Sequence, residues 1–568
     1  MSLPPDVLAS PLYSEDMAPV PPEKRTWQKW DLAALWVGMA VCIPTYLLAS
    51  YMMRSGLSWQ MALLIIGLAN AVITIPMALN GDAGVRYGIP FPVIGRTAFG
   101  IRGIHLASLV RGFVACGWFG VQTWIGGLAF YSIWNVLTGN EGVVGLSAGK
   151  FLAFALFWLL NIYFIWRGTE SIKWLEDFSA PILIVMGLVF IYWGYQHGGG
   201  FSEVLRAGEQ MQKPTAVWMS NAPNRTGNAT LRVELNPLKY PDGRLKASEM
   251  QLTISGAGKA VSLGWQAIPA KGFVEIPVLS SSDVQPTIKV QFRNSKGHTS
   301  SWLTAAPENT SQGVSFWQYV LWFTAMVGFW ATMSISISDI TRFAKSQKDQ
   351  VLGQFIGLPG TMIFYSFVGI FVTAAALMAF EDVLTSEDAP WDPVSLVAKF
   401  QNPVVVVFAQ VAMIIATLST NIAANVIAPA NAISNLFPQK ISFRMGGVFA
   451  GIVGIVLCPW WLMDQISSIL VFVSGLLGPV LGVLLCDYFV IRKRQLVVAD
   501  LYRVNGPFAY GGSGVNPVAI VALLVGVLVA LSGYWISALD FLYTLSWFTG
   551  FAVAFVAYFV MMKNKNYV

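Results

Sequence analysis

The sequence predicts an all-α polytopic membrane protein that is interrupted once by a β-rich insert. Of its 568 residues, 55% are hydrophobic and only 11% are charged, and the mean hydropathy is +0.60. Soluble domains carry about 25% charged residues. Apolar runs near the roughly 20 residues that cross a bilayer recur along the chain. They predict twelve spans: 31–53, 58–80, 107–137, 149–166, 178–196, 314–338, 355–380, 402–430, 445–463, 466–490, 517–534 and 538–562.

The first 30 residues form a polar, proline-rich tail. The tail lacks the basic and then apolar order of a cleaved signal peptide. We therefore expect the first span to serve as the signal for insertion. Residues 1–30 are then expected not to cross the membrane.

The lysines and arginines predict which side of the membrane each loop faces. In the twelve-span arrangement the short loops on one side carry only Arg54, Lys150 and Lys399, and the remaining loop cations fall on the other side. The positive-inside rule makes that basic side cytoplasmic. Both termini are then cytoplasmic, in a cell inner (plasma) membrane surrounded by lipid. The net charge of +6 follows from this topology and is not a nucleic-acid signature.

Without the insert, the first ten spans divide into two groups of five. The groups cover 31–197 and 313–495, and residues 496–568 hold a cytoplasmic loop and two trailing helices. An odd-numbered repeat unit is inverted relative to its copy, and inverted pairs bind substrate near the midplane beside broken helices. Breaks are predicted in the first span of each group, at GMAVCIPTY (38–46), which contains a proline, and at VGFWATMSIS (327–336).

The insert, residues 198–312, breaks the membrane pattern with a polar, turn-rich composition. Four segments in it alternate apolar and polar residues with period two, which is typical of strands: 230–235, 250–254, 272–278 and 287–292. We expect a small β-rich extracytoplasmic domain between spans five and six. A decorative or assembly role is the simpler interpretation, and substrate capture is the alternative.

The stretch GWFGVQTWIGG (117–127) carries a glutamine and two tryptophans inside a long apolar run. An unpaired amide in hydrocarbon costs several kcal/mol, so Gln122 must face protein, water or a ligand. Trp118 lies four residues earlier, on the same helical face. A flat aromatic wall beside an amide suits a planar ring with adjacent N–H and C=O groups. Trp330 of span six would supply a second wall, whereas Trp124 is expected to pack.

Span eight, ATLSTNIAANVIAPANAISN (416–435), places two asparagines four residues apart at membrane depth. Polar groups inside a membrane are usually functional. Asn421 is expected to form hydrogen bonds between helices. Asn425 is the candidate for contact with a ligand.

The oxygen ligands in the predicted spans indicate which ion is coupled to transport. No carboxylate lies in the middle of a predicted span, and a proton-coupled carrier usually keeps a titratable group on its pathway. The polar groups near the first break are the hydroxyls of Ser419 and Thr420 and the carbonyls of span one. This set favours Na⁺ as the coupling ion, with H⁺ as the alternative. The four cysteines and three histidines have no metal-ligand spacing.

Five segments occur in an order that is specific for one transporter family. They are RYGIPFPVIGRTAFGIRG (86–103), GWFGVQTWIGG (117–127), WATMSISISDITRFAKSQ (330–347), LSTNIAANVIAPANAISN (418–435) and DYFVIRKRQLVVADLY (487–502). In this order they resemble the nucleobase:cation symporter-1 family, whose bacterial members carry hydantoins, allantoin, uracil and related compounds. The resemblance covers nearly the whole chain outside the insert. It implies a LeuT-type fold, with a 5+5 inverted repeat followed by two helices.

The resemblance also implies roles for residues of the substrate site. Trp118 and Trp330 would sandwich the substrate ring, and Gln122 and Asn425 would hydrogen-bond to its ureido or imide edge. The chain departs from the family pattern at Cys42, where some members have glutamine.

The family's sodium site combines carbonyls of span one with groups of span eight. By position it corresponds to the carbonyls of Gly38, Val41 and Ala416 and to the hydroxyls of Ser419 and Thr420. A second departure, Phe329 in place of a glycine, narrows the expected substrate pocket.

The sequence thus predicts a secondary-active symporter that imports a small planar amide or imide heterocycle with Na⁺. H⁺ coupling on the same fold is the first alternative. A membrane sensor that uses the external β domain is a second alternative, although the chain has no cytoplasmic output domain. A membrane enzyme is the weakest, because no catalytic triad or metal cluster is evident.

Overall fold

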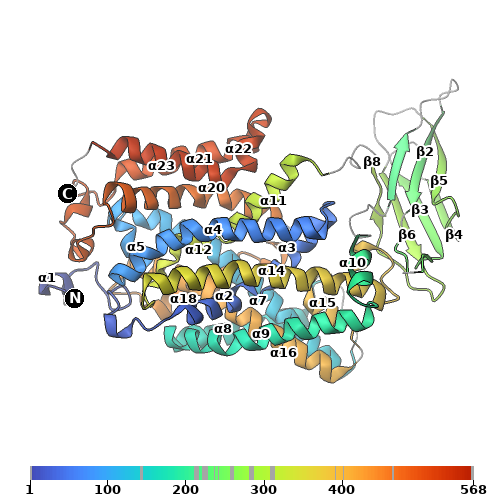
Figure 1. Cartoon of the computed structure of the whole chain (residues 1–568), viewed down its shortest axis with the longest axis horizontal. Coiled ribbons are helices and arrows are strands. Elements are labelled where there is room, and N and C mark those ends of the chain that lie inside the picture. Colours follow the sequence, from blue (N-terminus) through green and yellow to red (C-terminus); the bar gives the residue numbers. More distant parts are fainter. Residues whose placement is uncertain are drawn as a thin grey trace.

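A long helical bundle and a separate body of strands make up the protein (Figure 1). The strands lie at one end of the bundle, and the two ends of the chain lie at the other end. The computed structural model describes residues 3–140, 145–209, 216–220, 228–235, 237–240, 242–255, 261–279, 287–307, 314–390, 392–400, 402–462 and 466–564.

Nine helices among the described residues are long and apolar enough to cross a membrane. They comprise α4 (Trp59–Tyr87), α7 (Ile104–Thr138), α8 (Ala148–Arg167), α9 (Thr169–His197), α11 and α12 (Phe316–Phe329, Ala331–Ser336), α14 (Gln347–Ala379), α16 to α17 (Pro403–Thr420, π-helix η5 Asn421–Val426, Ile427–Leu436), α20 with π-helix η7 (Ile466–Leu485, Cys486–Ile491) and α21 (Pro517–Trp535).

Two bent pairs raise the number of possible spans to eleven among the described residues. The first pair is α2 (Lys29–Ala40) with α3 (Ile43–Arg54), and the second joins 537–544 to α23 (Ser546–Met562). The predicted ninth span, 445–463, corresponds to α18 (Phe443–Val456), which has 14 residues and is shorter than a bilayer requires. The count of twelve therefore stays a prediction.

Hydroxyl and amide side chains define where many of these helices begin. Each accepts a hydrogen bond from a backbone N–H of the first turn, which would otherwise lack a partner. The capping residues include Ser58 of α4, Ser147 of α8, Ser315 of α11, Ser346 of α14, Asn402 of α16, Ser442 of α18 and Asn516 of α21.

The first span is broken at Val41 and Cys42, as the sequence predicts. Helix α2 ends at Ala40, and α3 leaves it at an angle of 60°. Pro44 lies in the first turn of α3, where its missing N–H costs nothing. A second, milder interruption separates α11 from α12 at Trp330, inside the predicted segment 327–336. Each predicted group of five spans thus begins with an interrupted helix.

In the described part of the chain, eight strands form two four-stranded sheets, ordered β5-β2-β1-β8 and β4-β3-β6-β7. All pairings are antiparallel except β1 with β8. The strands are β1 (Ala216–Ser220), β2 (Asn228–Leu235), β3 (Glu249–Ser255), β4 (Val261–Ala267), β5 (Phe273–Leu279), β6 (Thr287–Arg293), β7 (Leu303–Thr304) and β8 (Ala306–Pro307). β2, β3, β5 and β6 coincide with the four alternating segments of the sequence. On β3 and β6 the apolar side chains are buried in alternation, as period two requires.

The strand body rests on the segment that follows α14. Lys246 Nζ donates hydrogen bonds to the carbonyls of Leu377 and Phe380, at 2.7 and 2.6 Å. Helix α10 (Phe201–Glu209) precedes the strands and buries Val204 against the bundle. Residues 198–209 of the predicted insert therefore belong to the helical body, and the described strands begin at Ala216.

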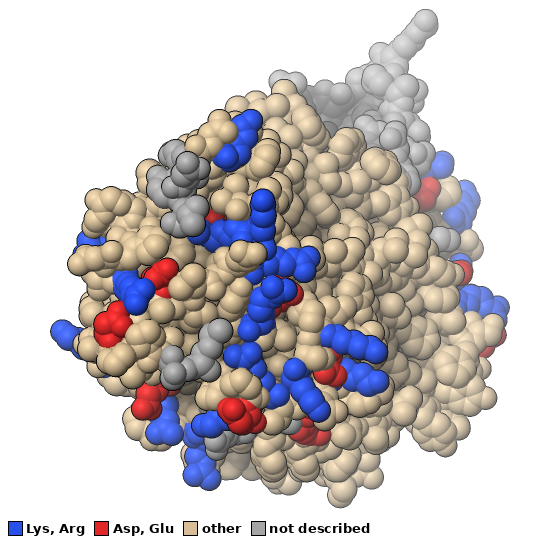
Figure 2. All heavy atoms as spheres, turned by 60° about the vertical axis from the view of Figure 1, so that its left-hand side comes forward, with Lys and Arg blue, Asp and Glu red and all other residues tan. Residues whose placement is uncertain are grey.

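The N-terminal tail packs across the end of the bundle. Asp16 accepts a hydrogen bond from the backbone N–H of Phe443, at 2.8 Å, and its carbonyl accepts one from Arg342, at 3.0 Å. A cavity of about 790 Å³ opens between this tail and Arg167, Arg342 and Arg444. Lysine and arginine side chains gather on this end of the molecule (Figure 2).

Candidate substrate and cation site

The four predicted substrate residues come from three elements that pack around the two helix breaks. Trp118 and Gln122 lie on α7, Trp330 lies between α11 and α12, and Asn425 lies in η5. Helix α7 packs directly on η5. The side chain of Gln122 also lies beside the thiol of Cys42, in the break of the first span.

A chain of aromatic rings links the two predicted walls. Trp330 is buried, and its ring meets that of Trp36 edge to face, with 5.1 Å between centroids. Phe329 contacts Trp330 at 5.0 Å and Trp118 at 5.6 Å. The phenyl ring thus bridges the two indoles. That Phe329 narrows the substrate pocket stays a prediction. That both indoles stack on a substrate stays a prediction.

Two buried polar atoms of this site have no hydrogen-bond partner among the described residues. They are Gln122 Oε1, an acceptor, and Trp330 Nε1, a donor. Gln122 is 2% exposed and Trp330 is 3% exposed. Leaving a buried polar group unpaired costs about 1–3 kcal/mol. A ligand with both an N–H and a C=O group offers the partners that these two atoms lack.

Asn421 forms hydrogen bonds between helices, as predicted. Its Nδ2 donates to Thr123 Oγ1 and Asn161 Oδ1, each at 3.0 Å, and to the carbonyl of Phe119 at 3.3 Å. Its Oδ1 accepts from Asn425 Nδ2 at 3.2 Å. Asn421 therefore orients Asn425 and ties η5 to α7 and α8.

We expect Asn421→Leu to lower the thermal unfolding midpoint by several degrees. Hydrogen bonds between membrane helices contribute about 0.6 kcal/mol each on average, up to about 1.7, and this substitution removes all of those described above. The measurement is the unfolding midpoint of the detergent-solubilised protein. Thr417→Val is the control, because the Thr417 hydroxyl bonds only within its own helix, to the carbonyl of Met413. Equal midpoints for the two variants would contradict a bridging role.

Trp124 packs, as the sequence indicates. Its ring lies 5.5 Å from Phe151, 5.9 Å from Phe154 and 5.7 Å from Trp460. It faces α8 and α19 (Pro459–Leu462), whereas Trp118 of the same helix contacts Phe329.

The predicted cation ligands gather at the break in the first span. Thr420 Oγ1 donates to the carbonyls of Gly38 and Met39, at 3.0 and 3.2 Å. Ser419 lies beside Gly38, since a Cβ atom on that glycine would lie 2.4 Å from Ser419 Oγ.

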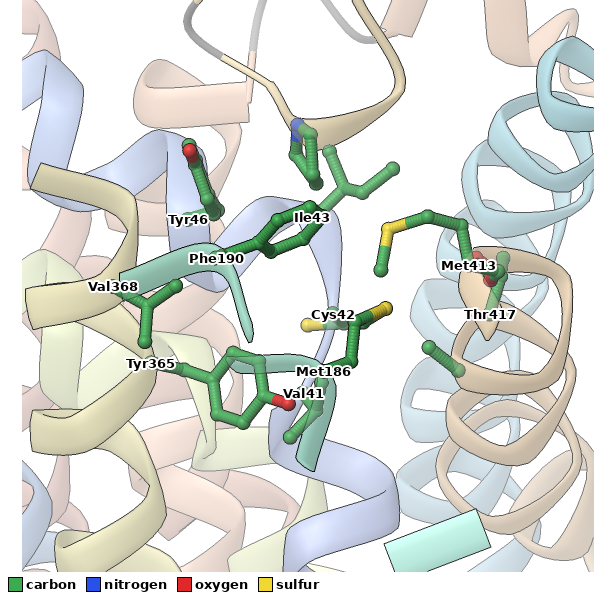
Figure 3. Close-up of a pocket in the computed structure, with 12 residues that line it drawn as sticks. Val41, Cys42, Ile43, Tyr46, Met186, Phe190, Tyr365, Val368, Met413 and Thr417 are labelled. Atoms are coloured by element: carbon green, nitrogen blue, oxygen red, sulfur yellow. Dashed lines mark hydrogen bonds between the residues drawn. The ribbon is translucent and has the colours of Figure 1, made fainter. Parts of the chain in front are cut away.

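Val41 and Ala416 line one small cavity of about 20 Å³, together with Cys42, Met413 and Thr417 (Figure 3). A volume of this size is close to the space that one water occupies. All five predicted ligands therefore border the same helix break.

The sequence predicts no carboxylate in the middle of a span, and it did not place Glu176, which lies near the start of the membrane helix Trp174–His197. Helix α9 begins at Thr169, well before the predicted start of span five at 178, so Glu176 lies inside the helix. Glu176 is 1% exposed, and its Oε2 accepts a hydrogen bond from Ser419 Oγ at 2.6 Å. The predicted ligand set thus gains an anionic neighbour, and the argument from an absent carboxylate no longer separates Na⁺ from H⁺.

Arg111 is a second buried charge that the sequence reasoning missed. It is 1% exposed on α7, and its Nε donates to Ser336 Oγ at 3.1 Å. Its Nη2 donates to the carbonyl of Ala424, beside Asn425, at 3.2 Å. A lone arginine within an apolar run was itself the signal, because an intramembrane charge is costly and usually functional.

The oxygen donors around the first break fit a sodium ion. Carbonyls freed by an unwound helix and nearby hydroxyls are the ligands of Na⁺ in transporters with inverted repeats. Glu176 Oε1 is buried and has no hydrogen-bond partner among the described residues, so an oxygen ligand remains available.

Residues 19–223 and 284–556 match the family model described as "permease for cytosine/purines, uracil, thiamine, allantoin". The unmatched gap lies within the strand body. Allantoin permease of Bacillus subtilis (strain 168) is 31% identical over 563 residues, which cover 97% of this chain and 93% of that protein. Purine-uracil permease NCS1 of Arabidopsis thaliana is 31% identical over 97% of this chain and 78% of its own length.

Solved structures share the fold. Mhp1, a nucleobase-cation-symport-1 family transporter solved in a closed conformation with bromovinylhydantoin bound, superposes with a TM-score of 0.69 at 21% identity, over 97% of this chain and 95% of its own. A Na⁺-coupled sialic acid symporter gives 0.56 at 12% identity, over 95% and 90%. The bundle therefore has the predicted LeuT-like fold. The permease family model and the permease relatives show that the chain is a membrane transporter and not an enzyme. The chain belongs to the nucleobase:cation symporter-1 family of permeases.

Proposed function

We propose that this protein is a symporter that imports a small planar heterocycle with adjacent N–H and C=O groups, such as hydantoin, allantoin or uracil, together with Na⁺. The observation that carries the proposal is the unpaired buried acceptor Gln122 Oε1. An N–H group on the edge of such a ring donates to this amide oxygen. The names of the relatives, which include allantoin, hydantoin and uracil permeases, support the same substrate class.

Within this proposal, Trp118 and Trp330 bind the faces of the ring, and Gln122 and Asn425 bind its edge. Asn425 comes from η5, which Asn421 fixes against α7. The ring would then lie beside the interruptions at Val41–Cys42 and at Trp330. Alternating access follows when one repeat rocks against the other around this site.

Na⁺ is the coupling ion that the donor set supports best. The carbonyls of Gly38, Val41 and Ala416 and the hydroxyls of Ser419 and Thr420 would hold it. When bound, the ion bridges α2 and α16, which come from different repeats, and so favours the conformation that binds substrate.

Coupling to H⁺ is the second candidate, and Glu176 is the observation that favours it. A buried carboxylate beside the helix break is a group that a proton-coupled carrier requires. Uptake driven by an imposed pH gradient, in the complete absence of sodium, would separate this candidate from the first.

The membrane orientation forms part of the proposal. The basic end of the bundle, which carries both ends of the chain, would face the cytoplasm by the positive-inside rule (Figure 2). The strand body at the opposite end would then be extracytoplasmic, and the membrane would be the cell inner (plasma) membrane.

The test of the proposal is uptake of labelled allantoin, hydantoin and uracil into proteoliposomes. An inward Na⁺ gradient is expected to drive accumulation of at least one of them, and dissipation of the gradient should release it. Accumulation that is identical in sodium and in choline would contradict Na⁺ coupling.

Deletion of the strands tests whether the protein acts as a transporter or as a sensor. Residues 216–307 are replaced by a short Gly/Ser linker, and α10 is kept because it packs on the bundle. We expect the shortened protein to retain Na⁺-driven uptake, because no predicted site residue lies in the strands. Substrate binding that disappears although the helical bundle remains folded would favour the sensor instead.

A further inference from the structure

The carboxylate of Glu176 lies directly against the last turn of α2. A Cβ atom placed on Gly38 would lie 1.6 Å from Glu176 Oε2 and 2.4 Å from Ser419 Oγ. Only glycine leaves room for the carboxylate at this position. The acidic side chain is thus built into the break of the first span.

The hydrogen bonds around this carboxylate are incomplete. Ser179 Oγ donates to Ser419 Oγ at 3.2 Å, and Ser419 Oγ donates to Glu176 Oε2 at 2.6 Å. The Ser419 hydroxyl therefore orients toward the negative charge, whereas the Ser179 hydroxyl also has the backbone carbonyl of Glu176 within reach, at 3.3 Å. The other oxygen, Oε1, has no hydrogen-bond partner among the described residues.

The electrostatic surroundings of Glu176 are also negative. Within the described part of the chain, no lysine, arginine or histidine forms an ion pair with Glu176. The charged neighbour along the chain, Asp177, is acidic as well. The carboxylate also faces the C-terminal turn of α2, whose carbonyls carry the partial negative charge of a helix end. A lone buried carboxylate in such a place is costly unless a cation compensates it.

We infer that Glu176 is a direct ligand of the coupling cation and supplies the full negative charge of its site. This inference rests on the proposed Na⁺ coupling and adds to the carbonyls and hydroxyls a ligand that no resemblance implies. The unpaired Oε1 supplies the lone pairs, while Ser419 fixes the other oxygen. The cation site then combines ligands from α2, α9 and α16, so that bound Na⁺ would link three helices.

The experiment measures Na⁺ binding by the purified full-length protein without transport. The thermal unfolding midpoint is followed as NaCl replaces choline chloride at constant ionic strength, with no substrate present. The wild-type midpoint is expected to rise with Na⁺ and to saturate. Glu176→Gln should shift the half-saturating Na⁺ concentration upward by at least about tenfold, which equals 1.4 kcal/mol. Glu176→Asp should fall between the two proteins.

Asp177→Asn is the matched control, because it removes the adjacent carboxylate, which is exposed on the same helix. Its response to Na⁺ should equal that of the wild type. Gly38→Ala is a second variant that keeps every charge but places a methyl group where Oε2 lies, and it should also lose the response. If Glu176→Gln does not fold, the response of Gly38→Ala to Na⁺ tests the inference instead.

Two results would overturn the inference, and they are distinguishable. If Glu176→Gln and Gly38→Ala keep the wild-type response to Na⁺, Glu176 is not a ligand, although the proposed function stands. If the wild-type protein itself responds equally to Na⁺ and choline, and uptake follows a pH gradient alone, Na⁺ coupling fails and the inference fails with it.

Discussion

Gln122→Leu is expected to abolish measurable uptake while leaving the protein folded and in the membrane. Leucine has nearly the volume of glutamine but can neither donate nor accept, so a bound ring would keep two unpaired polar atoms. At about 1–2 kcal/mol for each atom, the apparent affinity should fall by roughly 30- to 700-fold. The measurement is the concentration dependence of labelled allantoin or hydantoin uptake in proteoliposomes, normalised to the amount of protein inserted.

Gln354→Leu provides the matched control for this prediction. Gln354 is also fully buried in a membrane helix, and its Oε1 also has no hydrogen-bond partner among the described residues, but its Nε2 donates to Gln350 of the same helix, α14, which carries no predicted site residue. Its replacement should leave substrate affinity unchanged, even if stability falls. A Gln122→Leu protein with wild-type substrate affinity would exclude Gln122 as a contact.

Trp118→Leu is expected to weaken substrate binding by roughly 5- to 150-fold. Stacking of a flat heterocycle on an aromatic side chain contributes about 1–3 kcal/mol. Trp118→Phe should recover part of this loss, because a smaller flat wall remains. Competition of unlabelled heterocycles for labelled uptake measures the effect for each ring.

Trp124→Leu, six residues further along α7, separates stacking from packing. The Trp124 ring contacts aromatic side chains of α8 and α19. Its loss should lower the unfolding midpoint without changing the affinity for the heterocycle. If both tryptophan variants lose stability and neither loses affinity, the indole of Trp118 is a packing residue as well.

Local sequence patterns predict much of this fold, because their causes are local. A long apolar run needs only a bilayer in order to become a helix, and Pro44 favours the first turn of a helix, where its missing N–H is not needed. Strands β2, β3, β5 and β6 follow from strict alternation, which places one face in the core. Trp118, Gln122 and Trp330 stand out because their polar atoms are costly at membrane depth.

Glu176 could not be placed in a span from hydropathy. The segment RGTESIKWLEDF (167–178) has so many charges that it is typical of a loop, yet α9 begins inside it. Packing alone distinguishes Glu176, which faces α2 and α16, from the neighbouring Asp177, which is exposed. The predicted N-terminal tail could not be placed against the bundle from the sequence, since its contacts with Phe443 and Arg342 are distant in sequence.

The buried charges of Glu176 and Arg111 lie near the site and contact different helices. Glu176 lies at the break of the first span, beside the predicted cation ligands. Arg111 lies on α7 and bonds to α12 and to η5.

A structure of the protein with a bound heterocycle, determined in the presence of Na⁺, tests the central claim most directly. We predict that the ring lies midway through the helical bundle, with its faces on Trp118 and Trp330 and its polar edge within hydrogen-bonding distance of Gln122 and Asn425. A ring found only among the strands β1 to β8, or one that leaves these four side chains without contact, would contradict it.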